Sequence, residues 1–127
     1  MVFGSVTDPG RLASLAARAA ASKQGEAIVV LDVRDLITIT DYFVIVSGTS
    51  DRQLKTISDE VVRTLKEQGT RPVRQEGEPG AGWVLLDFVD FVVHVFSQDQ
   101  RDFYRLDNLW ADAPVVDWDG QAEAASR

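Results

Sequence analysis

Apolar residues recur every three or four positions in two stretches of the chain, which is the spacing of an amphipathic helix. The first stretch, residues 9–24, follows Asp8, and an aspartate N-cap ahead of a first-turn proline is typical of a helix start. The second, residues 51–68, follows Ser50 and carries Gln53 three residues later, the spacing of a capping box. We therefore predict helices over both stretches.

Short runs of β-branched and aromatic residues, each bounded by turn residues, indicate strands. We predict five of them, over residues 26–32, 42–47, 71–76, 83–88 and 91–97. Pro72 marks the third as an edge strand, because proline has no amide hydrogen to donate to a neighbour. Only Val89-Asp90 separates the last two, which predicts an antiparallel hairpin although neither is an ideal turn residue.

A third helix is predicted from Asp99 to Trp110, with its apolar residues on one stripe: Phe103, Leu106, Leu109 and Trp110. The resulting order α-β-β-α-β-β-β-α predicts a single α/β domain, a mixed five-stranded sheet flanked by helices. We assign residues 1–113 to this domain. Residues 114–127 form an acidic tail, in which Val115, Val116 and Trp118 are expected to dock locally and disorder is expected from Gly120 onward.

The amino-acid composition excludes several kinds of functional site. The 127 residues include no cysteine and one histidine, His94, which excludes disulfides, thiol nucleophiles and cysteine-bound zinc and leaves too few imidazoles for a histidine-rich metal site. Twenty acidic against thirteen basic residues give a net charge of −7, so the chain should avoid extensive contact with nucleic acid and suit a basic protein partner. No segment matches a membrane span or a secretory signal, so we expect a cytoplasmic protein without membrane contact.

Two groups of residues are candidates for enzyme chemistry. The segment Gly48-Thr49-Ser50 follows a strand and opens a helix, so its amides could cradle a phosphate, although a plain turn with a helix cap is the more common use. The carboxylates of Asp41, Asp87 and Asp90 could hold a divalent cation. Asp87 and Asp90 are three apart rather than two, however, so they do not share one strand face, and turn aspartates are the favoured interpretation.

Two further features have both a structural and a functional interpretation, and a third has only a structural one. His94 stands among apolar residues, where it is either a general base or, more commonly, a hydrogen-bonded structural histidine. Trp83, with Val84 and Leu85 beside it, is either core or the anchor of a protein interface. The charged residues Arg101, Asp102 and Arg105 are expected to form a solvated helix face.

Several motifs in a fixed order closely resemble the ribosomal silencing factor (Iojap) family over residues 10–113. They are Asp41–Ser50, Gln53, Glu76-Gly77, Gly82–Phe88, Val92–Phe96, Arg101–Leu106 and Leu109-Trp110. The resemblance implies a small α/β domain with a nucleotidyltransferase-like outline but no such activity. It also implies homodimers, and binding to the fourteenth large-subunit ribosomal protein at the subunit interface, where the domain would block joining of the small subunit.

Carried onto this chain, the family's protein-binding surface comprises Trp83, Val84, Leu85, Asp87, His94 and Tyr104. One departure is visible, because relatives often have Gly-Asp where this chain has Val89-Asp90. No cofactor, metal or catalytic residue is expected. The favoured function is a translational repressor that acts by steric exclusion, and the alternative is a small nucleotidyltransferase-like enzyme that binds a phosphate or nucleotide.

Overall fold

The computed structural model describes residues 8–104, 108 and 110–119 of the chain. Its helices are α1 (Pro9–Ser22), α2 (Asp51–Glu67) and α3 (Gln98–Tyr104), and a 3₁₀ turn, η2, spans Pro79–Ala81. Its strands are β1 (Glu26–Asp32), β2 (Tyr42–Gly48), β3 (Arg74–Glu78), β4 (Trp83–Asp87), β5 (Phe91–Ser97) and β6 (Val115–Val116). None of these helices has both the length and the apolar character that a bilayer span requires.

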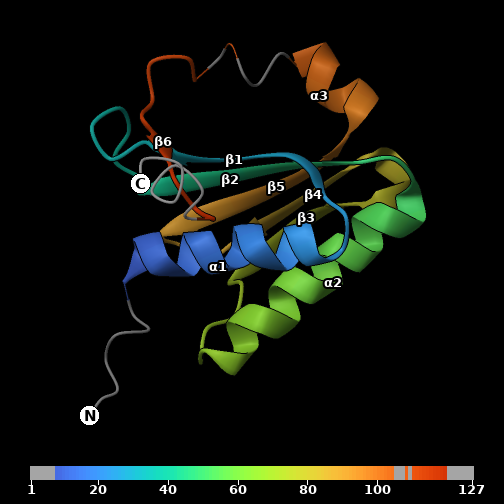
Figure 1. The fold of residues 1–127 in the computed structure, drawn as a ribbon, viewed down its shortest axis with the longest axis horizontal. Coiled ribbons are helices and arrows are strands. Elements are labelled where there is room, and N and C mark those ends of the chain that lie inside the picture. The colour runs from blue at the N-terminus through green and yellow to red at the C-terminus, as the bar shows by residue number, and fades with distance from the viewer. Residues whose placement is uncertain (1–7, 105–107, 109, 120–127) are drawn as a thin grey trace, which may run out of the picture.

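The strands form one mixed sheet in the order β3-β4-β5-β2-β1-β6, in which only β2 and β5 run parallel (Figure 1). The predicted single α/β domain with a mixed sheet is confirmed, but the prediction of five strands is wrong. The sixth strand is the pair Val115–Val116, which lies antiparallel to Val30 and Leu31. A two-residue strand is too short to produce a periodic pattern in the sequence.

Helices α1 and α2 cover one face of the sheet, and most of the core lies beneath them (Figure 1). Leu54, Ile57, Val61 and Leu65 of α2 are fully buried there, at the helical spacing seen in the sequence. Every residue of β2 is buried, because β2 is a central strand with covered faces. The main hydrophobic core therefore lies between the sheet and these two helices, and the two faces of the sheet differ in how far they are covered.

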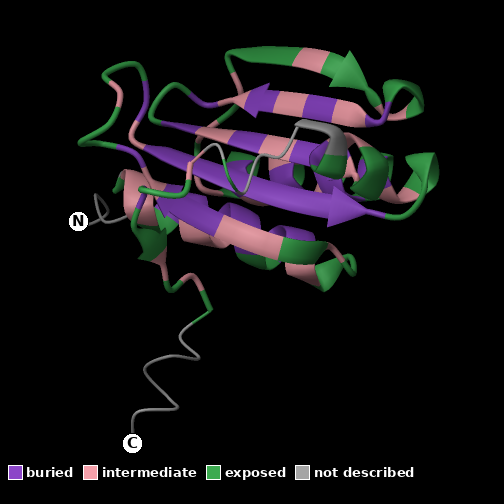
Figure 2. Ribbon diagram, turned by 90° about the horizontal axis from the view of Figure 1, so that it is seen from above, coloured by how far each residue is buried: buried purple, intermediate pink, exposed green. Residues whose placement is uncertain are grey.

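The residues that the structure describes cover the opposite face only in part. Over β1 and β2, a small cluster of Leu31, Val33, Phe43, Ile45 and Ala113 is buried, and the Trp110 ring meets the Phe43 ring edge-on at 4.9 Å. Residues 110–112 form a turn, so the predicted helix over 99–110 is wrong at its end. Part of that prediction, residues 105–107 and 109, lies outside the described residues. Half-buried and buried residues alternate along β4 (Figure 2), and the half-buried ones, Trp83, Leu85 and Asp87, lie on this face.

The start of the tail docks on the domain as predicted. Val115 and Val116 pair with β1, Trp118 packs against the main core, and the Trp118 carbonyl accepts a hydrogen bond of 3.1 Å from Arg18 Nε. Residues 120–127, for which disorder was predicted, lie outside the described part of the chain. The division of the chain at residue 113 remains a prediction.

The hairpin between β4 and β5 forms as predicted, and its turn is strained. Val89 has a φ of 77°, in the left-handed region that a β-branched residue rarely adopts. Asp87 Oδ1 accepts a hydrogen bond of 2.8 Å from the Val89 amide and so holds the turn. The departure from Gly-Asp at this turn therefore has a local energetic cost.

Candidate functional site

The candidate site lies on β4 and β5, on the face of the sheet that points away from α1 and α2. Alternate residues of the two strands form it. Successive side chains of a strand point to opposite faces, so Trp83, Leu85 and Asp87 of β4 share one side. They stand opposite Phe96, His94 and Val92 of β5 respectively. We call these six residues the open face.

Trp83 lies against the backbone of Gly77 on β3. A Cβ built on Gly77 would come within 2.3 Å of the Trp83 carbonyl oxygen and 2.5 Å of its ring carbon Cε3, and Gly77 also has a φ of 76°. Only glycine therefore allows the ring to lie where it does. This contact gives a physical reason for the Glu76-Gly77 pair that the sequence pointed to, since it fixes a large aromatic at the edge of the open face.

His94 sits within a row of aromatic rings across β2 and β5. The Phe43 ring meets it edge-on at 5.1 Å and the Phe96 ring stacks on it at 5.9 Å. Removal from water disfavours the charged imidazole and lowers the pKa of His94 to about 4, so it is neutral near pH 7. Its Nδ1 is buried and has no hydrogen-bond partner, so the predicted hydrogen-bonded structural histidine is wrong for this atom.

Charged residues of β3 and β4 form a rim beside the apolar centre of the open face. Arg74 pairs with Glu76 at 3.0 Å and with Asp87 at 3.3 Å, and Glu78 stands opposite Trp83 in the register. Three carboxylates against one guanidinium leave this rim negative. An apolar patch with a negative rim is complementary to a partner that offers apolar and basic side chains.

The structure brings together four of the six predicted binding residues. Trp83, Leu85, Asp87 and His94 lie on the open face, whereas Val84 points to the opposite face and is 5% exposed beneath the helices. Strict alternation along β4 separates Val84 from Trp83 and Leu85 even in the sequence alone. The backbone of Tyr104 ends α3, and its side chain lies outside the described residues.

Sequence reasoning missed the contribution of β3, whose Arg74 and Glu76 extend the site. Pro72 had marked the predicted strand over residues 71–76 as an edge strand, but the pairing of each residue with β4 depends on the register. The sequence analysis also predicted that Arg101 lies on a solvated helix face, and this prediction is wrong. Arg101 is 4% exposed, and its Nη1 donates to the Ala27 carbonyl at 2.6 Å and to Ser47 Oγ at 2.8 Å. It anchors α3 to β1 and β2.

The candidate phosphate loop at residues 48–50 is occupied by the protein's own side chains. Ser50 Oγ caps α2 by accepting from the Gln53 amide at 3.1 Å, as the capping-box spacing predicted. Gln53 Oε1 accepts from the Thr49 amide at 2.6 Å, and Gln53 Nε2 donates to the Gln24 carbonyl at 2.8 Å. The loop therefore ties α2 to the turn after α1, and this use accounts for its sequence without a ligand.

Asp41, Asp87 and Asp90 do not form a metal-binding group in the structure. Asp87 is engaged with the Val89 amide and Arg74, and the Asp90 carbonyl accepts a backbone hydrogen bond of 2.9 Å from the Asp41 amide. Across the residues that the structure describes, no three histidine, cysteine, aspartate or glutamate side chains are placed to hold a metal ion. The turn interpretation of Asp87 is confirmed by its hydrogen bond.

Comparisons with known proteins agree on one family. The family model described as ribosomal silencing factor during starvation matches residues 7–127. The chain is 41% identical to ribosomal silencing factor RsfS of Halalkalibacterium halodurans over 109 residues, which cover 86% of this chain and 93% of that protein. It is 42% identical to RsfS of Bacillus subtilis over 105 residues, covering 83% and 89% respectively.

A solved structure shows the same fold. The crystal structure of a protein from Chromobacterium violaceum matches with a TM-score of 0.78 at 34% identity, over 82% of this chain and 87% of that one. The sequence matches and the structural match thus cover the same single domain.

Proposed function

The chain belongs to the ribosomal silencing factor family, and from this premise we propose that it represses translation by binding the large ribosomal subunit and sterically blocking its union with the small subunit. In this proposal its partner is the fourteenth ribosomal protein of the large subunit. In this proposal the protein works in the cytoplasm. It acts without catalysis, because occupying the subunit interface needs no chemical step.

The observation that carries the proposal is the open face itself. It presents an aromatic and an aliphatic side chain, Trp83 and Leu85, which are half-buried and lie on the side of β4 that faces away from α1 and α2. Tryptophan at the centre of an interface commonly contributes more to binding than its neighbours do. The negative rim of Glu76, Glu78 and Asp87 supports a basic ribosomal protein as the partner, and the overall charge of −7 disfavours RNA as the main contact.

Cosedimentation with purified large subunits tests the proposal. We expect the wild-type protein to pellet with large subunits, and Trp83→Ala and Leu85→Ala to bind about 30-fold more weakly, the effect of losing about 2 kcal/mol at an interface anchor. Val115→Ala is a matched control, because Val115 is apolar and 73% exposed but lies on β6 at the far edge of the sheet.

Two results would count against the proposal. If wild-type protein stays at the top of the gradient, large-subunit binding is wrong. If Trp83→Ala and Val115→Ala bind equally well, the assignment of the binding surface is wrong even though the subunit remains the partner. Homodimer formation, which the family resemblance implies, stays a prediction that sedimentation equilibrium tests.

A further inference from the structure

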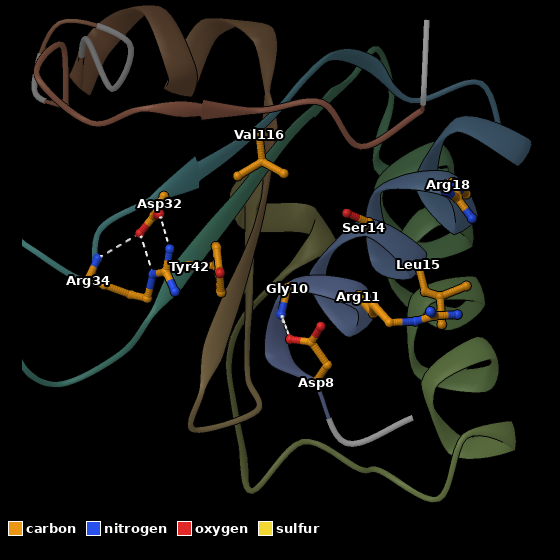
Figure 3. A pocket seen from close by; sticks show the side chains of 10 residues that line it. All are labelled: Asp8, Gly10, Arg11, Ser14, Leu15, Arg18, Asp32, Arg34, Tyr42 and Val116. Atoms are coloured by element: carbon orange, nitrogen blue, oxygen red, sulfur yellow. Dashed lines mark hydrogen bonds and ion pairs between the residues drawn. The ribbon is translucent and has the colours of Figure 1, made fainter. Parts of the chain in front are cut away.

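A cleft of about 510 Å³ lies on the helix side of the sheet, between α1 and the neighbouring strands β1, β2 and β6 (Figure 3). It is separate from the open face, which lies on the other side of the sheet and at the opposite edge. The ribosomal function proposed above makes no use of this cleft. Three of the thirteen basic residues of this acidic chain, Arg11, Arg18 and Arg34, line it.

Two of these arginines come from one stripe of α1. Arg11 and Arg18 are seven residues apart, almost two full turns, so they project from the same side of the helix about 10.5 Å apart along its axis. Ser14 lines the cleft between them. Arg18 is held in place by its Nε hydrogen bond to the Trp118 carbonyl, a neutral acceptor. Within the described residues, neither Arg11 nor Arg18 forms an ion pair with a carboxylate.

The two carboxylates that line the cleft are already engaged. Asp8 Oδ1 caps α1 by accepting from the Gly10 amide at 3.1 Å. Asp32 accepts two hydrogen bonds from Arg34, at 3.0 Å from Nε and 2.7 Å from Nη2, and the Arg34 guanidinium lies 5.4 Å from the centre of the Tyr42 ring (Figure 3). The Asp32–Arg34 pair is therefore close to neutral, and Arg11 and Arg18 against the single carboxylate of Asp8 leave the lining of the cleft with a net positive charge.

We propose that this cleft binds a small ligand that carries two or more phosphate groups, with Arg11 and Arg18 each taking a phosphate and the Ser14 hydroxyl donating a hydrogen bond between them. Guanidinium groups suit phosphate because their N–H donors form a fork that matches two oxygens. The cleft has the volume of a small-molecule site. A small ligand is favoured over RNA because a net charge of −7 repels a long phosphate backbone, whereas two local arginines suffice for a short one.

Isothermal titration calorimetry at constant ionic strength tests this site, with inorganic pyrophosphate, orthophosphate and a single-stranded RNA of twelve nucleotides as probes. The test variant is Arg11→Gln with Arg18→Gln. The control is Arg52→Gln with Arg71→Gln, which removes the same charge from two exposed positions elsewhere. Ser14→Ala is a milder second variant, and thermal melting of every variant verifies that it folds.

We expect pyrophosphate to bind wild type and control equally, and more tightly than orthophosphate. The Arg11/Arg18 variant should bind pyrophosphate at least about 10-fold more weakly than wild type. A 10-fold loss is the effect expected from losing one hydrogen bond to a charged group. Three results would each overturn the proposal. Pyrophosphate could give no heat of binding, or the two double variants could bind it equally well. RNA could also bind in a way that needs Arg11 and Arg18 while pyrophosphate does not bind. Cosedimentation of the Arg11/Arg18 variant with large subunits should be unchanged, so this test is independent of the ribosomal one.

Discussion

Burial of the imidazole of His94 makes the stability of the protein depend on pH in a window where few other groups titrate. In the folded protein the pKa of His94 is about 4, against 6.5 for an exposed histidine, because the Phe43 and Phe96 rings exclude water from it. The unfolded chain therefore binds more protons than the folded one between these values. The free energy of unfolding must then fall as the pH is lowered from about 6.5 towards 4.

The size of this effect follows from the two pKa values. At pH 5 the imidazole is almost fully protonated in the unfolded chain and mostly neutral in the folded one, which lowers the free energy of unfolding by about 2 kcal/mol relative to pH 7.5. For a domain with a total stability of about 5–15 kcal/mol this is a large fraction. Asp32 and Glu60 also have a lowered pKa, each through an arginine partner, but their contributions are lost only below about pH 4.5.

Urea unfolding at pH 7.5, 6.5, 5.5 and 5.0 measures the effect, with His94→Phe as the matched variant that keeps a ring in the same place. Wild type should lose about 2 kcal/mol across this range, and His94→Phe should lose much less. Because the chain has one histidine, the imidazole proton resonances also report its pKa directly by NMR. Equal pH dependence in the two proteins, or a resonance that titrates near pH 6.5, would refute the reasoning.

Three substitutions test the strained and close-packed positions, each by urea unfolding. Val89→Gly should stabilise the protein by about 0.5–1 kcal/mol, because relief at a φ of 77° exceeds the extra entropy of glycine; a loss of stability would contradict the strain. Gly77→Ala should destabilise it by about 2 kcal/mol or more through its clash with the neighbouring tryptophan, whereas Gly80→Ala, with open space around it, should not. Arg101→Met should cost about 2–4 kcal/mol by leaving buried acceptors unpaired, and the exposed Arg52→Met less than about 0.5 kcal/mol; equal effects would disprove the anchoring role.

Local signals in the sequence were sufficient for most of the elements. The spacing of Ser50 and Gln53 predicted the start of α2, and the run of apolar residues in β2 predicted a buried strand, because both depend on neighbours along the chain. The strand β6 and the buried role of Arg101 depend instead on partners about 75 to 85 residues away, Val30 and Ala27. No local pattern encodes such contacts.

The candidate site divides in the same way. Trp83 and Leu85 were candidates from the sequence and lie on the open face, and period-two alternation alone would have removed Val84 from the candidates. Arg74 could be added to the candidate site only once the register between β3 and β4 was known. The cleft lined by Arg11, Arg18 and Arg34 could be found only once the packing of α1 against β1 was known. Faces of single elements are thus accessible from the sequence, whereas surfaces built from several elements need the fold.

The most direct test of the central claim measures binding and subunit joining in one experiment. Large subunits saturated with the protein are mixed with small subunits, and light scattering follows the formation of whole ribosomes while pelleting reports occupancy. The account predicts that joining stops when the protein is bound, and that Trp83→Ala restores it in proportion to the occupancy it loses. Normal joining by large subunits that remain fully occupied would contradict the account.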